Sequence, residues 1–112
     1  MMKFTLFLML EATPAWLRLP RAERNAIVNP VLSGALDGMA ATLRHFDAEA
    51  FHARISDVAM IEAASAETAY FVMERLRDSP LIADEYFRLA GIVPAFENGY
   101  REFETRERSD AA

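Results

Sequence analysis

Residues 4–10 read Phe-Thr-Leu-Phe-Leu-Met-Leu, a nearly uninterrupted apolar run that decides the fold. Its length and its aromatic and aliphatic content are typical of a strand buried on both faces. The flanking segments 1–3 and 12–15 imitate a secretory leader, but Thr5 interrupts the run and Glu11 follows it at once. We therefore interpret the run as the first strand. No apolar run in the sequence approaches the ~18 residues of a membrane span, so no membrane partner is expected.

The composition is that of one globular domain over residues 1–112. Apolar residues make up 53% and charged residues 26% of the sequence, a balance that supports a packed core. The sequence has no cysteine, which excludes disulfides and thiol nucleophiles and predicts a reducing, cytoplasmic location. The net charge is −5 and the basic residues form no cluster, so a nucleic-acid partner is not expected.

Capping and turn residues divide the rest of the chain. Thr13 and Pro14 suit an N-cap and the first helical position, so they predict a short turn that ends at residue 17. Apolar spacing predicts a helix over 20–36, kinked at Pro30, and a second helix from Ser65 to about residue 78. Three further strands are expected, over 41–47, 54–63 and 86–93, and Pro94 should break the last of them. A turn over 81–84 should precede that strand. A terminal helix should begin at residue 96 and fray over 105–112.

This order is β-α-β-β-α-β, the ferredoxin-like plan of an α+β domain with a four-stranded antiparallel sheet. Crossover connections are right-handed, so both main helices are expected on one face of the sheet. The other face then has no cover from its own chain, although the first strand is apolar on both of its faces. Large uncovered apolar faces mark interfaces. We therefore predict a homodimer whose two sheets close a dimeric α+β barrel.

The placed segments contain several short motifs, namely Thr13-Pro14-Ala15-Trp16-Leu17, Arg21-Ala22-Glu23-Arg24, Phe46-Asp47-Ala48-Glu49-Ala50-Phe51, Ser56-Asp57, Leu76-Arg77-Asp78, Tyr86-Phe87 and Ile92-Val93-Pro94-Ala95. With these motifs the chain resembles the darcynin family of small bacterial proteins over about residues 3–104. The resemblance implies the fold of dimeric α+β barrel proteins. It implies no activity, because the family is functionally uncharacterised. Two positions depart from the family pattern and could reshape a pocket: Pro20 stands where Ser is usual, and Ile61 stands where Trp is usual.

The densest polar cluster lies between residues 44 and 57, where two expected strands are joined. A hairpin-like connection brings the end of one strand beside the start of the next, so these side chains should crowd one rim. Proton transfer on an anionic substrate uses three kinds of side chain: a His that acts as the base, an Asp that orients the His, and an Arg that binds the anion. The cluster predicts a catalytic set of His45, Asp47 and Asp57 and a substrate-binding set of Arg44, Arg54, Glu49 and His52. The alternative is an ion-pair network that only fixes the connection.

Three aromatic residues, Trp16, Tyr70 and Tyr86, are further candidates for substrate binding, with ordinary core packing as the alternative. His45 and His52 could join a nearby carboxylate in a metal site of the 2-His-1-carboxylate type. Their spacing matches no metal motif, so no metal is predicted. The glycines form no phosphate-binding loop, so no cofactor is predicted either.

Two functions from different classes fit these residues. The first is a cofactor-free enzyme that moves protons or oxygen on a small anionic or aromatic molecule. The second is a non-catalytic dimer that binds a ligand or another protein. Barrel dimers of this plan commonly host pockets, which favours the enzyme by analogy. The enzyme hypothesis requires His45 and Asp47 to lie within about 3–4 Å of each other and to open onto one pocket.

Overall fold

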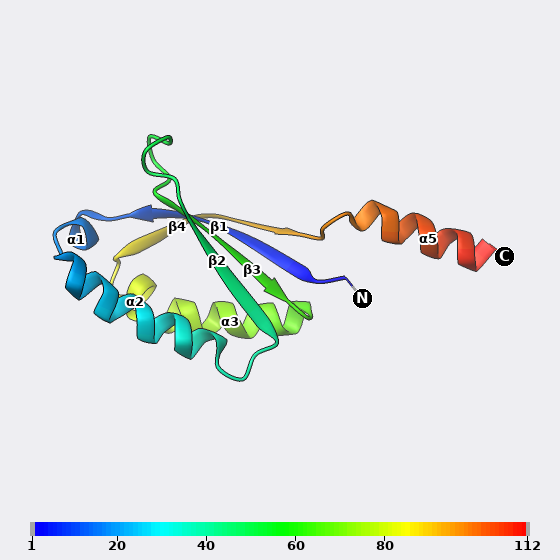
Figure 1. Ribbon diagram of the computed structural model, residues 1–112, viewed down its shortest axis with the longest axis horizontal. Helices are drawn as coiled ribbons and strands as arrows, with labels where there is room; N and C mark the ends of the chain where they lie inside the picture. Colours follow the sequence, from blue (N-terminus) through cyan, green and yellow to red (C-terminus); the bar gives the residue numbers. More distant parts are fainter. Residues whose placement is uncertain (1, 112) are drawn as a thin grey trace.

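The computed structural model describes residues 2–111 and places the two main helices on one face of a four-stranded sheet (Figure 1). The strands are antiparallel and lie in the order β2-β3-β1-β4. This is the predicted ferredoxin-like plan. The elements are β1 (Phe4–Ala12), α1 (Pro14–Leu17), α2 (Arg21–Leu36), β2 (Ala41–Asp47), β3 (Asp57–Ala63), α3 (Ala66–Asp78), α4 (Pro80–Ala83), β4 (Phe87–Ala95) and α5 (Gly99–Ala111).

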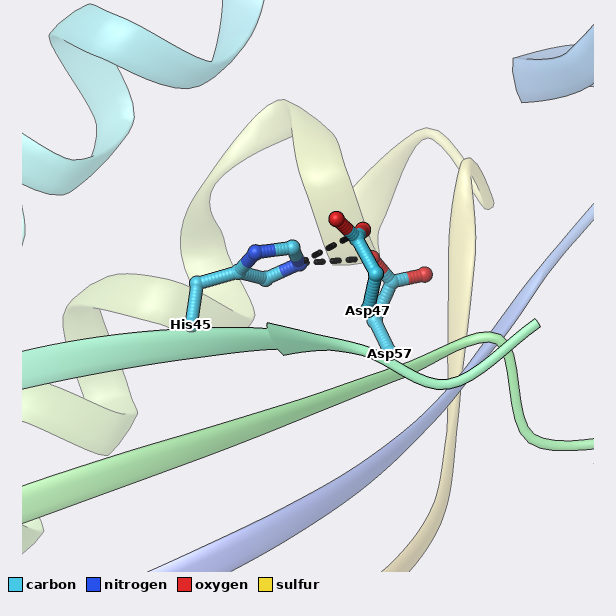
Figure 2. Close-up of side chains that lie close together, drawn as sticks. All are labelled: His45, Asp47 and Asp57. Atoms are coloured by element: carbon cyan, nitrogen blue, oxygen red, sulfur yellow. Dashed lines mark hydrogen bonds and ion pairs between the residues drawn. The ribbon is translucent and has the colours of Figure 1, made fainter. Parts of the chain in front are cut away.

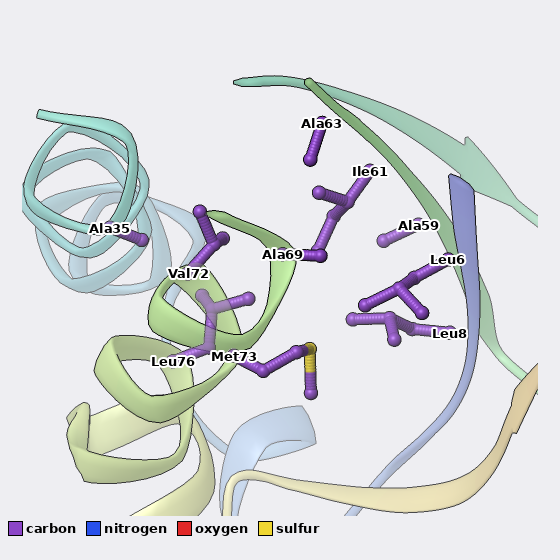
Figure 3. Close-up of a cluster of buried hydrophobic side chains, with 10 residues drawn as sticks. All are labelled: Leu6, Leu8, Ala35, Ala59, Ile61, Ala63, Ala69, Val72, Met73 and Leu76. Carbon is purple, nitrogen blue, oxygen red and sulfur yellow. The ribbon is translucent and has the colours of Figure 1, made fainter. Parts of the chain in front are cut away.

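The core lies between the sheet and the helices, and Figure 3 shows its buried side chains converging from both layers. Alternate residues of β1 and β3 supply the sheet side, and the stripe of α3 predicted from the sequence supplies most of the other side. Ile61 and Val72 are fully buried at the centre. The cluster consists of Leu6, Leu8, Ala35, Ala59, Ile61, Ala63, Ala69, Val72, Met73 and Leu76.

Two predicted helix starts are confirmed by their caps. The Thr13 hydroxyl accepts the backbone N–H of Trp16 at 3.5 Å, and it donates to the Glu85 carbonyl at 2.6 Å. It thereby joins α1 to the turn before β4. The Ser65 hydroxyl accepts the backbone N–H of Thr68 at 3.1 Å at the start of α3.

Three predicted boundaries need correction. Strand β3 begins at Asp57 rather than at residue 54, because Ser56 closes the preceding loop by bonding Ala48 and Leu10 through its backbone. Pro94 does not break the last strand; β4 runs through it to Ala95, which an edge strand tolerates because one side of its backbone needs no ladder partner. Helix α5 begins at Gly99 rather than at residue 96, and it projects from the body of the domain (Figure 1).

The sheet face opposite the helices carries an apolar surface without cover from its own chain. The strand pairing places on it Phe7 of β1, between Met60 of β3 and Val93 of β4, and Met9 of β1 beside Val58 of β3. Val93 is 50% exposed. We call this surface the open face, and its large apolar side chains are those of Phe7, Met9, Phe46, Val58, Met60 and Val93. The second face of β1 is thus left partly exposed in the single chain, whereas the sequence predicts a strand buried on both faces.

In the described part of the chain, no helix combines the length and the apolar character needed to cross a membrane.

Candidate functional site

A cavity of about 330 Å³ lies between the sheet and the helices. The sheet supplies its floor, and side chains of α1, α2, α3 and α4 supply its walls. Most lining residues are apolar, and only three are polar: Asn25, His45 and Asp57. The full lining consists of Leu8, Leu10, Trp16, Asn25, Val28, Leu32, Leu43, His45, Asp57, Ala59, Met73, Leu76, Leu81, Ile82, Phe87 and Leu89.

The cavity exists because α2 packs mainly on α3 and α4 rather than on the sheet. Ala35, near its end, is the buried residue of α2, so most of the helix stands off the strands. On the floor, Ala59 lies between its cross-strand partners Leu8 and His45. A methyl side chain at this position leaves room above the strand that a larger residue would fill.

His45 and Asp57 are the two polar residues that the sheet contributes to the cavity lining, and Figure 2 shows their side chains together. His45 lies near the end of β2 and Asp57 at the start of β3, so the hairpin-like pairing of these strands brings them together. The His45 Nε2 atom is 2.6 Å from Asp57 Oδ2. The Asp57 side chain is 16% exposed and the His45 side chain is 48% exposed, which places the pair at the mouth of the cavity.

Asp47 is the second carboxylate of this group. Its Oδ1 atom is 3.8 Å from the same Nε2 atom of His45, within the distance that the enzyme hypothesis requires. The second requirement is not met, because the Asp47 side chain is 81% exposed and does not line the cavity. Asp57, rather than Asp47, is therefore the carboxylate that orients the His45 ring from within the cavity lining.

The contacts assign distinct roles to the two ring nitrogens of His45. An ionised carboxylate can only accept hydrogen bonds, so Nε2 donates to Asp57. The neutral ring then keeps its lone pair on Nδ1, which points away from both carboxylates in Figure 2. A carboxylate that holds one ring nitrogen fixes the orientation of the ring, which leaves Nδ1 with a lone pair that can accept a proton.

The same three side chains also form a donor set for a cation. His45, Asp47 and Asp57 each offer one ligand atom, and these atoms lie within 4.8 Å of one another. One imidazole nitrogen and two carboxylate oxygens suit a divalent transition metal. They differ from the combination weighed in the sequence analysis, because His52 is not among them.

The other predicted polar residues lie outside the cavity. Arg44 points to the open face, where its guanidinium carbon is 5.3 Å from the Phe46 ring centroid. Arg54 pairs with Glu11 at 3.1 Å. His52 accepts the backbone N–H groups of Arg54 and Ile55 through Nδ1 and so shapes the loop, and the exposed Glu49 lies in the same loop. The structure therefore separates the arginines from the His45–Asp57 pair.

The three aromatic candidates lie in different surroundings. Trp16 is 8% exposed and lines the cavity, where its ring lies 4.9 Å from that of Phe87. Tyr86 does not line the cavity but packs against Trp16, with 5.6 Å between their ring centroids. Tyr70 is 60% exposed and contacts Phe71 on the outer side of α3. Trp16 is thus the one member of this group with access to a ligand.

Asn25 is a cavity residue that the sequence analysis missed. A usable signal was present, because Asn25, Val28 and Leu32 share one face of α2 through their spacing of three and four residues. Their common orientation toward the cavity follows from that spacing. An amide on an otherwise apolar helix face is a candidate anchor for a ligand.

Comparisons with known proteins agree with this architecture. The profile of the darcynin family, described as a domain of unknown function, matches residues 2–111. Darcynin of Chromobacterium violaceum is 48% identical over 64 residues, covering 57% of this chain and 81% of that protein. The darcynin homolog of Granulibacter bethesdensis is 33% identical over 98 residues, covering 86% of this chain and 78% of that protein.

Among solved structures, the chlorite dismutase of Candidatus Nitrospira defluvii in complex with imidazole is similar with a TM-score of 0.70 and 12% identity. A second protein bearing the name chlorite dismutase has a TM-score of 0.70 and 17% identity. The matches cover 86% of this chain but only 40% and 44% of the other two, so the chain spans less than half of their length. At such identities the likeness shows the fold alone.

Proposed function

The chain belongs to the darcynin family, and we propose that it binds a small, uncharged, largely apolar molecule in its cavity and moves a proton on that molecule through His45. The observation that carries this proposal is the 2.6 Å contact between His45 Nε2 and Asp57 Oδ2 on the wall of a cavity of about 330 Å³. A carboxylate-oriented His is a common general base, and this volume lies within the range of small-molecule sites.

The lining favours an aromatic ligand without charge. Arg44 and Arg54 lie outside the cavity, so the lining holds no cation that could pair with an anionic ligand apart from a protonated His45. Trp16 and Phe87 offer aromatic surfaces, and Asn25 offers one amide for orientation. The aromatic part of the earlier expectation is therefore favoured over the anionic part.

The proposed step is a proton transfer at carbon beside a carbonyl. The C–H bond of the ligand breaks, its proton moves to His45 Nδ1, and its electron pair forms the enolate. Asp57 stabilises the resulting imidazolium through the proton held on Nε2, and Asp47 adds a more distant negative charge. Return of a proton from Nδ1 to the enolate restores the ligand and the neutral ring.

The probe for this step is 2-tetralone, an uncharged bicyclic ketone with acidic C–H bonds. NMR in D₂O measures the rate at which its α-protons exchange for deuterium in the presence of the protein. We expect exchange to exceed that caused by the same concentration of free imidazole by at least ~10²-fold, the usual lower contribution of a positioned acid–base group. The variant His45→Gln should abolish the excess, and Asp57→Asn should reduce it strongly.

The variant His52→Gln is the matched control, because the second histidine of the sequence lies in the exposed loop outside the cavity. It should leave the exchange rate unchanged. Equal rates for the protein and free imidazole would refute the proton-transfer proposal. Binding of 2-tetralone without accelerated exchange would favour the non-catalytic alternative, in which the cavity only stores or carries a ligand.

We also propose that the working form is a homodimer that buries the open face. Isologous pairing of two open faces removes the same apolar side chains from water in both copies. Light scattering at micromolar concentration should give twice the mass of the chain. The sequence contains no cysteine, which supports a reducing compartment such as the cytoplasm as its location.

A further inference from the structure

The loop between β2 and β3, residues 48–56, presents one aromatic side chain to solvent. Figure 1 shows the loop rising from the sheet on the side away from α2 and α3. Phe51 lies within this loop and is 96% exposed, whereas the next most exposed large apolar side chain among the described residues, Phe103, is 63% exposed. Phe51 therefore gains nothing from packing in its own chain.

The loop is nevertheless built by a set of hydrogen bonds. The Ala48 carbonyl accepts the backbone N–H groups of Phe51 and His52, both at 3.0 Å, and the Ala48 N–H donates to the Ser56 carbonyl at 2.8 Å. His52 Nδ1 accepts the N–H of Ile55 at 2.7 Å. The exposed Phe51 thus stands on a preformed loop, which lowers the entropy cost of docking it onto another surface.

The loop that carries Phe51 rises on the side of the sheet away from α2 and α3, and this is also the side of the open face (Figure 1). Phe46, 44% exposed at the end of β2, continues the open face toward the loop that carries Phe51. A partner that covered only the loop would bury far less than the ~1,000 Å² of a stable interface. A partner that lies on the open face and also contacts the loop at the edge of the sheet would bury both apolar surfaces at once.

We propose that Phe51 is an anchor residue that packs against a second copy of this chain and stabilises the dimer. This inference rests on the homodimer of the proposed function and adds the residue on which its stability depends. In a two-fold pair each copy receives the Phe51 of the other, so one side chain contributes twice. Exposed aromatic residues that become buried at an interface are frequent hot spots of binding energy.

The test is the dimer dissociation constant, measured by analytical ultracentrifugation from about 0.1 to about 100 µM protein. The variant Phe51→Ala should raise that constant at least ~10-fold, because two anchors are lost, whereas Phe51→Trp should stay within ~3-fold of the wild type. The matched control is Phe103→Ala, which removes an exposed Phe of α5 and should also stay within ~3-fold. Because both phenylalanines are exposed, neither substitution should unfold the chain.

Two results would overturn the inference, and they are distinguishable. A wild-type dimer whose dissociation constant is unchanged in Phe51→Ala refutes the anchor but keeps the dimer. A wild-type chain that stays monomeric at the highest concentration refutes both the anchor and the dimer. Neither result affects the proton-transfer proposal, which the exchange rate of 2-tetralone tests separately.

Discussion

Replacing Ala59 by Leu should stabilise the fold and abolish ligand binding. Ala59 is 5% exposed and lies on the floor of the cavity between Leu8 and His45. A leucine there would extend into the open space of about 330 Å³ instead of displacing packed neighbours. The same space is the proposed ligand site, so stability and binding should change in opposite directions.

The size of the effect follows from the added apolar groups. Leucine adds roughly three carbons, each worth about 0.8 kcal/mol when buried, or about 2.4 kcal/mol in total. Loss of rotamer freedom subtracts about 0.5–1 kcal/mol. The net gain of about 1–2 kcal/mol corresponds to a Tm increase of about 4–8 °C for a chain of this size.

The control is Ala69→Leu, the same chemical change at a position without space. Ala69 is 1% exposed and belongs to the packed core rather than to the cavity lining. Overpacking should cost about 1–3 kcal/mol there. Urea unfolding measures both free energies, and calorimetric titration measures the affinity for 2-tetralone. If Ala59→Leu destabilises the fold as much as Ala69→Leu does, or leaves the affinity intact, the cavity is not the ligand site in solution.

Two further substitutions test how the helices around the cavity are held. Thr13→Ala removes the buried hydroxyl that caps α1 and bonds Glu85, and should cost about 1–2 kcal/mol in urea unfolding, whereas Thr13→Ser should restore most of the loss. Arg75→Ala removes the guanidinium that donates to three carbonyls at the C-terminal end of α2. The free energy of unfolding should fall by at most about 1 kcal/mol, because only the end of one helix loses its partner. Amide hydrogen exchange in the last turn of α2 should become faster. Unchanged stability in the first case, or unchanged exchange in the second, would contradict these roles.

The fold was predictable because its signals are local. The apolar run of β1, the caps Thr13 and Ser65, and the apolar stripe of α3 each specify one element, and right-handed crossover then specifies the side of the helices. The misplaced boundaries depend on tertiary contacts instead. Pro94 is tolerated because β4 lies at the sheet edge, a property that no short stretch of sequence reveals.

The site was only partly predictable for a similar reason. His45 and Asp57 follow from the alternation of side chains on two paired strands, and the structure brings them together. The same alternation places Arg44 on the sheet face opposite His45. The prediction that both line one rim was wrong because it used only the closeness of the polar residues in the sequence. The sequence shows that Asn25 shares a helix face with Val28 and Leu32, but only the packing of α2 shows that this face lines the cavity beside His45.

The edges of the sheet have a consequence for larger assemblies. A free edge can recruit further strands and so polymerise into fibres. Here Pro94, which has no N–H group to donate, lies in the edge strand β4, and a shift in register beside Leu10 interrupts the regular ladder between β1 and β4. The β2 edge carries Arg44 and Asp47, charged side chains that pairing with a further strand would have to desolvate. These edges favour association through the open face instead, and in the proposed homodimer the isologous pairing of two open faces is closed.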